Sequence, residues 1–230
     1  MKVLVFGGNG LLGKAICNAG RELKGWHMGA ISRNSNGPLR GDILNPDSYR
    51  DILKDYDAVI DTVGILLENK TYKKSLSGDL STFITNGIPS LFNPMNKSIT
   101  YNDINRDSLI KLSNEVSNVG NSLNKDIPLV YISAHSCPPG IPKGYITSKR
   151  EAEYYMIKLS NEKGGIRPII LRPGFMYDAN DESNTRKMLK TVIGSASMFL
   201  NWVPPPVSTQ SIAIKCINAI DDNRYRGIIV

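Results

Sequence analysis

Short apolar runs alternate along the chain with segments of helical periodicity, and this alternation predicts the fold. Runs of about four to seven residues, rich in apolar side chains and bounded by turn residues, are typical of strands. They lie at 1–6, 26–31, 39–43, 57–63, 128–133, 167–171 and 227–230. Helical segments are expected at 14–19, 45–54, 101–119, 145–160, 183–203 and 208–220. Strands that alternate with helices form βαβ units, so we predict an α/β fold with a doubly wound parallel sheet.

All 230 residues are expected to form a single domain, residues 1–230. Two segments, at about 64–100 and 174–207, interrupt the pattern, and we expect them to face a substrate or a partner. Both contain apolar clusters, namely Phe83, Ile84, Ile88, Leu91 and Phe92 in the first and Met198, Phe199, Leu200, Trp202 and Val203 in the second. The second cluster is too short to cross a bilayer, but it suits a membrane surface or a lipophilic slot. Ordinary packing over the sheet is the alternative.

A glycine-rich turn, Gly7-Gly-Asn-Gly10-Leu-Leu-Gly13, joins the first expected strand to the first expected helix. In this context Gly7 permits a sharp exit from the strand, Gly10 lets the backbone approach a pyrophosphate, and Gly13 lets the helix pack closely. The N–H groups of the helix N-terminus attract the phosphates. We therefore predict an NAD(P)-binding Rossmann fold with cofactor contacts from Gly7, Gly10, Leu11, Leu12 and Gly13. A glycine-rich turn that binds nothing is the alternative.

The end of the second expected strand indicates which dinucleotide is bound. Arg33 follows this strand, and no Asp or Glu lies between Trp26 and Gly41. A carboxylate at this place binds the ribose 2′-hydroxyl of NAD, whereas a guanidinium accommodates the 2′-phosphate of NADP. We therefore predict NADP rather than NAD, unless Arg33 is a solvated loop residue. Asp42 and Ile43 resemble the pair that contacts the adenine in the short-chain dehydrogenase superfamily, which implies the same contact here.

Tyr145 and Lys149 form a Y-x-x-x-K motif, in which both side chains lie on one helix face. An ammonium near a phenol stabilises the phenolate and lowers the pKa of the tyrosine. The tyrosine then exchanges a proton with a substrate oxygen while hydride moves to or from a nicotinamide. Tyr154 and Lys158 repeat the motif nine residues later, on the opposite helix face, so the two pairs cannot share one site. The alternative is that Tyr145 and Lys149 form a surface pair on an amphipathic helix, without a catalytic role.

The position of the expected strands favours the first of these pairs. Ser133 ends a strand, and Tyr145 follows across a loop, near the carboxyl edge of the sheet where ligands bind in open α/β folds. Ser133 is expected to hydrogen-bond the substrate oxygen, or to be a plain strand-end hydroxyl. Resemblance to the short-chain dehydrogenase superfamily implies that an asparagine in the preceding helix completes the catalytic set. Asn105 is favoured over Asn102, and either residue is also suited to cap the helix.

Charge and composition narrow the function classes. The net charge of +7 and the pI near 9.2 come from scattered Lys and Arg residues, which argues against nucleic acid as a partner. The three cysteines are widely spaced and indicate a reducing compartment. With two histidines, no metal site is predicted. No signal peptide, cleavable presequence or membrane span is visible, so any targeting signal is expected to be internal.

These motifs, taken in order with Arg172-Pro-Gly174, resemble the atypical short-chain dehydrogenase/reductases over essentially the whole chain. Several phrases narrow the resemblance: Val5-Phe-Gly-Gly-Asn-Gly-Leu-Leu-Gly-Lys14, Gly64-Ile-Leu-Leu-Glu-Asn69, Ser148-Lys-Arg-Glu-Ala-Glu153, the run from Arg167 to Asp178, and Val207-Ser-Thr-Gln210. Together they are similar to fungal mitochondrial accessory proteins of coenzyme Q (ubiquinone) biosynthesis. That group is similar in turn to the NADPH-binding accessory subunit of respiratory complex I.

The resemblance implies a location on the matrix side of the mitochondrial inner membrane, with peripheral membrane contact. The implied partners are ubiquinone-biosynthesis proteins and a lipophilic quinone intermediate. Gly64 and Lys149 are added to the cofactor contacts, the latter on the nicotinamide ribose. Two functions follow. One is an NADP-dependent oxidoreductase that acts on a quinone or prenylated ring intermediate. The other is a non-catalytic NADPH-binding assembly or regulatory subunit of an inner-membrane complex.

Overall fold

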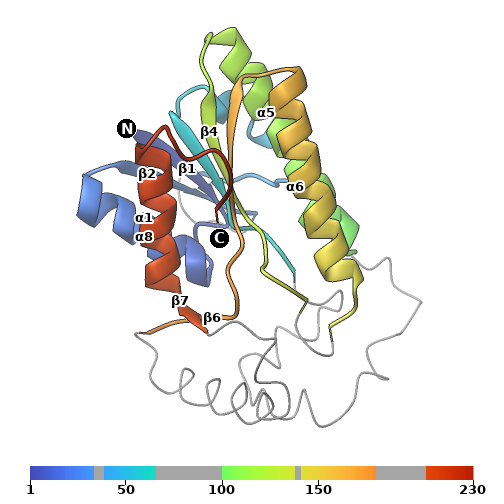
Figure 1. The fold of residues 1–230 in the computed structure, drawn as a ribbon. Helices are drawn as coiled ribbons and strands as arrows, with labels where there is room; N and C mark the ends of the chain where they lie inside the picture. The colour runs from blue at the N-terminus through green and yellow to red at the C-terminus, as the bar shows by residue number, and fades with distance from the viewer. Residues whose placement is uncertain (34–38, 66–99, 138–140, 180–205, 230) are drawn as a thin grey trace, which may run out of the picture.

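The computed structural model of the chain describes residues 1–33, 39–65, 100–137, 141–179 and 206–229 (Figure 1). The expected helix at 183–203 lies outside these residues. So do most of the segments at 64–100 and 174–207, including both apolar clusters.

Six strands form one sheet in which every neighbouring pair is parallel. Their order is β2 (His27–Ile31), β1 (Lys2–Phe6), β3 (Ala58–Asp61), β4 (Ile127–Ile132), β5 (Ile166–Leu171) and β8 (Gly227–Ile229). The strand order reverses at β1, because β2 is added on one side of it and β3 on the other. In doubly wound folds ligands bind at such a reversal, above the carboxyl ends of the strands.

Helices cover both faces of this sheet (Figure 1). One face carries α1 (Leu11–Lys24) and α8 (Thr209–Asp221), and the other carries α5 (Ser108–Ser122) and α6 (Gly144–Glu162). The shorter elements are η1 (Pro46–Ser48), α2 (Arg50–Leu53), the π-helix η3 (Asn102–Asp107), and the two-residue parallel strands β6 (Met176–Tyr177) and β7 (Val207–Ser208). The predicted doubly wound α/β architecture is confirmed.

The two faces of the sheet are two separate hydrophobic cores. In β1, Val3 and Val5 pack toward α1 and α8, whereas Leu4 and Phe6 pack toward α5 and α6. Successive side chains of a strand point to opposite faces, so a strand buried on both sides has to be apolar at every position. This requirement explains why the strands appear in the sequence as continuous apolar runs.

The predicted strand at 39–43 is wrong. A single parallel bridge between Ser32 and Arg40 is all that forms there. The chain then turns at Asp42, whose carboxylate accepts a hydrogen bond from the N–H of Leu44 at 3.1 Å, while its own N–H donates to Ser48 Oγ at 2.9 Å. Such local side-chain bonds satisfy the backbone and compete with strand pairing. The helix expected at 45–54 is likewise divided into η1 and α2.

A buried arginine ties strand β5 to the end of α8. Arg167 is 6% exposed, and its guanidinium donates to the carbonyl oxygens of Ile220 at 2.7 Å, Ala219 at 3.1 Å and Tyr225 at 2.7 Å. The last carbonyls of a helix have no partners within the helix and carry a partial negative charge. The arginine therefore caps the C-terminus of α8 from inside the protein and fixes this helix on the sheet.

Replacing this arginine is predicted to destabilise the protein. Arg167→Met leaves several buried carbonyl groups without donors, and we expect a loss of about 3 kcal/mol in the free energy of unfolding. Arg224→Ala is the matched control, because Arg224 forms an exposed ion pair with Asp222 at the same end of α8. Urea unfolding of the two variants checks this prediction. Equal stability of the two variants would contradict the capping role.

Candidate functional site

Polar and glycine residues gather at the carboxyl edge of the sheet, each at the end of a different strand. Gly7 follows β1, Ser32 follows β2, Asp61 ends β3, Ser133 follows β4 and Arg172 follows β5. Because the strands are parallel, these five positions lie along one edge. They surround the reversal of strand order between β2 and β3, which is the place where this architecture binds ligands.

The glycine turn has the geometry that its sequence predicts. Gly7 has a φ of +77°, which favours glycine, and its N–H donates to the carbonyl of Ile31 at 3.0 Å. A Cβ atom on Gly13 would lie 2.2 Å from the carbonyl oxygen of Gly7, so only glycine permits this approach of α1 to the turn. The N–H of Gly10 closes the turn by donating to the same oxygen at 2.8 Å.

The first turn of α1 is open to an anion. Gly10 occupies the N-cap position, no side chain caps the helix, and no acidic residue lies in its first turn. Leu12 is buried in the core, whereas Leu11 is 53% exposed. A long helix that begins at a glycine turn with uncapped N–H groups and a positive dipole end fits a pyrophosphate group.

Two arginines lie at the end of β2. Arg33 is exposed, and its backbone carbonyl accepts a hydrogen bond from Arg40 Nε at 3.0 Å. Asn9 of the glycine turn donates to Ser32 Oγ at 3.1 Å and links the turn to this region. Sequence reasoning missed Arg40 because it placed this residue in a strand. The sequence feature that could have identified Arg40 is that it is the second arginine in the stretch from Trp26 to Gly41, which contains no carboxylate.

Asp42 and Ile43 stabilise the fold at this point of the chain. The carboxylate of Asp42 holds the turn that replaces the expected strand. Ile43 is 5% exposed and belongs to the core under α5 and α6, and its carbonyl accepts a hydrogen bond from the hydroxyl of Tyr49 at 3.3 Å. Their expected contact with adenine stays a prediction.

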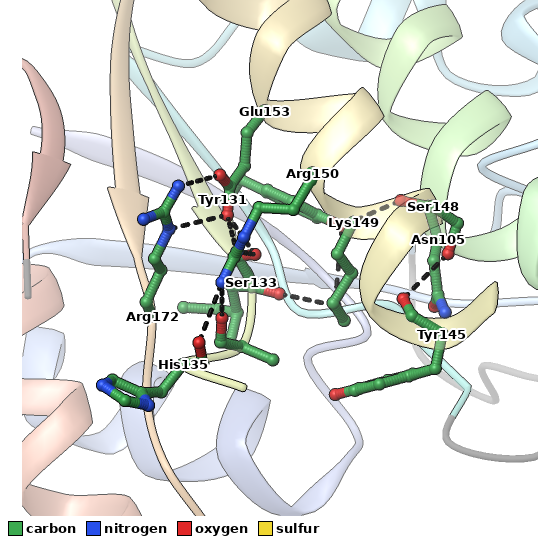
Figure 2. Close-up of polar contacts among 12 residues, drawn as sticks. Asn105, Tyr131, Ser133, His135, Tyr145, Ser148, Lys149, Arg150, Glu153 and Arg172 are labelled. Carbon is green, nitrogen blue, oxygen red and sulfur yellow. Dashed lines mark hydrogen bonds and ion pairs between the residues drawn. The ribbon is translucent and has the colours of Figure 1, made fainter. Parts of the chain in front are cut away.

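Lys149 extends from α6 to the end of β4 and is 4% exposed. Its Nζ donates to the carbonyl of Ile132 at 2.9 Å, lies 3.5 Å from the hydroxyl of Tyr131, and stands 4.9 Å from the centroid of that ring (Figure 2). Burial lowers the pKa of this amine to about 8, and the charge of Asp61 opposes the effect. Lys149 is therefore a buried cation that belongs to the sheet edge.

Tyr145 lies on the same helix face, with its ring centroid 5.8 Å from Lys149 Nζ. The ring contacts Tyr101 edge-on at 6.1 Å, and its hydroxyl forms no hydrogen bond with another described residue. Burial raises the pKa of Tyr145 to about 12. The motif predicts a lowered pKa. The structure differs because the phenol is buried, and the ammonium that would offset burial is bonded to β4 and not to the phenol oxygen.

The second Y-x-x-x-K pair faces away from the sheet, as predicted. Tyr154 is 69% exposed, and Lys158 lies 3.8 Å from Glu162 in an exposed ion pair. This pair provides an internal control for tests of the first.

Ser133 takes part in a buried charged cluster that the sequence did not predict (Figure 2). Its hydroxyl donates to the carboxylate of Glu153, which is 2% exposed, and accepts from Arg150 Nη1 at 3.2 Å. Arg172 clamps the same carboxylate with Nε at 3.1 Å and Nη2 at 2.5 Å, and this pairing raises the pKa of Arg172. The hydroxyl proton of Ser133 is therefore directed at Glu153.

Arg150 connects this cluster to the loop after β4. Its Nη2 donates to the carbonyls of Ala134 at 2.8 Å and His135 at 2.9 Å. The available signal in the sequence was the i, i+3 spacing of Arg150 and Glu153 on the helix that carries Lys149. Such pairs usually lie on the surface, so sequence reasoning did not single them out.

Asn105 is fully buried in the π-helix, whereas Asn102 is exposed. The side-chain amide of Asn105 makes two hydrogen bonds with the backbone of Ile65. It donates to the carbonyl at 3.0 Å and accepts from the N–H at 2.9 Å. A Cβ atom on the neighbouring Gly64 would lie 3.5 Å from Lys149 Nζ. The structure thus brings Asn105, Gly64 and Lys149 together, and Asn105 positions the chain after β3. Short π segments are often found at functional sites.

Asp61 is a further residue that the sequence reasoning missed. Its side chain is fully buried at the end of β3. Oδ1 accepts a hydrogen bond from the N–H of Val63 at 2.8 Å, and Oδ2 has no partner among the described residues. Burial raises the pKa of this carboxyl to about 7, against the effects of the Val63 N–H and of Lys149. The sequence feature that could have identified Asp61 is its place as an acidic residue at the end of an otherwise apolar strand.

Two further features follow from the described part of the chain. Within it, no three His, Cys, Asp or Glu side chains are grouped so that they could hold a metal ion. None of the described helices is both long enough and apolar enough to span a bilayer.

Comparison with solved structures identifies known proteins that have the same fold. Serine dehydrogenase from Escherichia coli superposes with a TM-score of 0.64 at 14% identity, and the match covers 100% of this chain and 96% of that one. UDP-glucose 4-epimerase from Thermus thermophilus, solved in complex with NAD, has a TM-score of 0.63 at 15% identity and covers 99% and 76%. The fold is therefore the doubly wound Rossmann fold that these enzymes have.

Comparison of sequences gives the family. No family model matches the chain. MIOREX complex component 2 of Saccharomyces cerevisiae is 32% identical over 272 aligned positions, which cover 99% of this chain and 96% of the yeast protein. The chain therefore belongs to the family of this yeast MIOREX complex component, and it has a Rossmann fold.

Proposed function

We propose that the chain binds NADP and acts in mitochondria as an oxidoreductase on a quinone or prenylated ring intermediate of ubiquinone biosynthesis. The glycine turn is the observation that carries the proposal. Gly13 touches the carbonyl of Gly7, and α1 begins without a cap directly above the reversal of strand order. In this position the N–H groups of α1 are suited to hold the pyrophosphate.

The preference for NADP over NAD is supported by charge. Arg33 and Arg40 lie together where the adenine ribose of a bound dinucleotide belongs, and no carboxylate follows β2 before Asp42. The carboxylate of Asp42 is bonded to the N–H of Leu44. Guanidinium groups in this region attract a 2′-phosphate, whereas a 2′-hydroxyl gains little from them.

The proposed reaction assigns the acid role to Tyr145. A bound NADPH supplies the hydride. With a pKa near 12, Tyr145 carries its proton at neutral pH, so it suits donation to a substrate oxygen better than abstraction of a proton. Lys149 holds a positive charge beside this ring and is suited to bond the nicotinamide ribose. These roles favour reduction of a carbonyl or quinone oxygen as the direction of the reaction.

Location and partners follow from relatives. The yeast relative is named as a component of the MIOREX complex, and we extend membership in a multiprotein complex to this chain. The phrases that resemble coenzyme Q accessory proteins support a place among ubiquinone-biosynthesis proteins on the matrix side of the inner membrane. The apolar segments at 64–100 and 174–207 are suited to meet a lipophilic quinone or the membrane surface.

One observation favours the alternative, a non-catalytic NADPH-binding assembly or regulatory subunit. The hydroxyl of Ser133 donates its hydrogen bond to Glu153, and two arginines hold that carboxylate in place. The hydroxyl is then not available to donate to a substrate carbonyl. In this alternative the cofactor stabilises the fold or reports the redox state, and Tyr145 serves only to pack against Tyr101.

Replacing Arg33 is predicted to change the choice of dinucleotide. Arg33→Ala removes a charge-assisted contact with the 2′-phosphate, so NADPH affinity should fall about tenfold or more while NADH affinity stays unchanged. Arg40→Ala should act in the same direction, and Arg224→Ala, far from the turn, should have no effect. Isothermal titration with both nucleotides measures the change. An equal loss of NADH and NADPH affinity contradicts the 2′-phosphate contact.

Replacing Tyr145 separates the two functions. Tyr145→Phe removes the proton donor and keeps the ring, so NADPH-dependent reduction of a short-chain quinone should fall about a hundredfold or more, with NADPH affinity retained. Tyr154→Phe is the matched control on the exposed face of the same helix. The same variants are expressed in yeast lacking MIOREX complex component 2, and quinone content is measured. Normal quinone content with Tyr145→Phe would favour the assembly function.

A further inference from the structure

The carboxylate of Asp61 has only half of its hydrogen-bonding capacity used. It is fully buried, one oxygen accepts the N–H of Val63, and the other has no partner among the described residues. A carboxylate placed in this way is costly unless a nearby positive charge compensates for the lost hydration. A cation beside Asp61 lowers this cost and favours the charged form of the carboxyl.

The sheet register shows where that cation lies. Asp61 pairs with Tyr131 in the parallel ladder of β3 and β4, and residues in matching register point to the same face of a sheet. Tyr131 belongs to the core on the α5 and α6 side, and Lys149 Nζ stands over its ring and 3.5 Å from its hydroxyl. The carboxylate of Asp61 and the amine of Lys149 thus lie on one face, around the same tyrosine.

The chain after β3 also brings Asp61 and Lys149 together. Val63 folds back to donate its N–H to Asp61, and a Cβ atom on the next residue, Gly64, would lie 3.5 Å from Lys149 Nζ. Asn105 holds this segment in place through Ile65. The chain that follows β3 therefore passes close to the amine of Lys149.

We propose that Asp61 is the buried counter-ion of Lys149 and holds this side chain as an ammonium at the carboxyl ends of β3 and β4. Two other charged groups near Lys149, Glu153 and Arg150, lie on its own helix. Glu153 is already paired with Arg150 and Arg172, so it has little net charge to offer. Asp61 has no other cation among the described residues. The phenols of Tyr131 and Tyr145 also face the amine, and both remain neutral at physiological pH.

The pair titrates close to neutral pH. Burial lowers the pKa of Lys149 to about 8 and raises that of Asp61 to about 7, and each charge opposes the shift of the other. The ammonium is present below a pH of about 8 and is lost above it. One consequence rests on the proposed function: if Lys149 bonds the nicotinamide ribose, NADPH affinity should fall as the pH rises through this range.

Removing the carboxylate tests the counter-ion directly. In protein labelled with ¹³C-lysine, the signal of Lys149 is assigned by its loss in Lys149→Met and titrated by NMR. Asp61→Asn should lower the pKa of Lys149 by about one unit or more, because the charge that stabilises the ammonium is gone. Asp57→Asn is the matched control, since Asp57 lies at the opposite edge of the sheet near Lys2. An Asp61→Asn midpoint equal to that of the control overturns the proposal.

The reciprocal variant keeps the proposal testable should Asp61→Asn fail to fold. Lys149→Met removes the ammonium, and the pKa of the Asp61 carboxyl, followed by its ¹³C signal, should then rise above its value in the parent protein. An unchanged carboxyl titration overturns the pairing. NADPH titrations across pH form a separate arm. Failure to bind NADPH at any pH refutes the proposed function, while the NMR titrations still decide on the pair.

Discussion

The close approach of α1 to the turn after β1 is the constraint on which the site depends. The Cα of Gly13 lies so near the carbonyl of Gly7 that no side chain fits between them. This approach aims the helix N-terminus at the reversal of strand order, and the bond from Gly7 to Ile31 fixes the turn to the neighbouring strand. A longer side chain at Gly13 would push the helix away from the place where its N–H groups are useful. A glycine at position 13 is therefore required both for the packing of α1 on the turn and for the proposed phosphate site.

Buried charges organise the other half of the site. Glu153, Lys149 and Asp61 are each less than 5% exposed. Lys149 is bonded to β4 and Glu153 to Arg172 after β5, whereas Asp61 accepts the N–H of Val63 just after its own strand. Breaking one partner of such a group is far more costly than losing a surface ion pair. Because α6 supplies Lys149, Arg150 and Glu153, and their partners lie on β4 and after β5, these bonds also fix the helix that carries Tyr145. The position of the phenol thus depends on charged groups that form no hydrogen bond with its hydroxyl.

Much of this arrangement could be predicted from the sequence, since it depends on local pattern. Doubly buried strands appear as apolar runs, the glycine turn has its own spacing, and Tyr145 with Lys149 follows from helical geometry. The strand at 39–43 was wrong because the apolar pattern does not reveal the side-chain bonds of Asp42 that bend the chain. Glu153 and Asp61 were missed for a different reason. Their charges are compensated by residues distant in the sequence, such as Arg172, and only the folded chain brings these together.

The hydrogen bonds of Ser133 limit what it does in the proposed reaction. A hydroxyl has one proton to donate, and Glu153 receives it, while Arg150 occupies one of the acceptor positions. What remains is a second lone pair, which can accept a hydrogen bond from a ligand but cannot donate one. Arg150 and Arg172 hold the carboxylate of Glu153 in two ion pairs, so this orientation is maintained as long as the cluster is intact. Ser133 therefore matches a hydroxyl on a ring intermediate, and proton donation to a carbonyl oxygen is left to Tyr145.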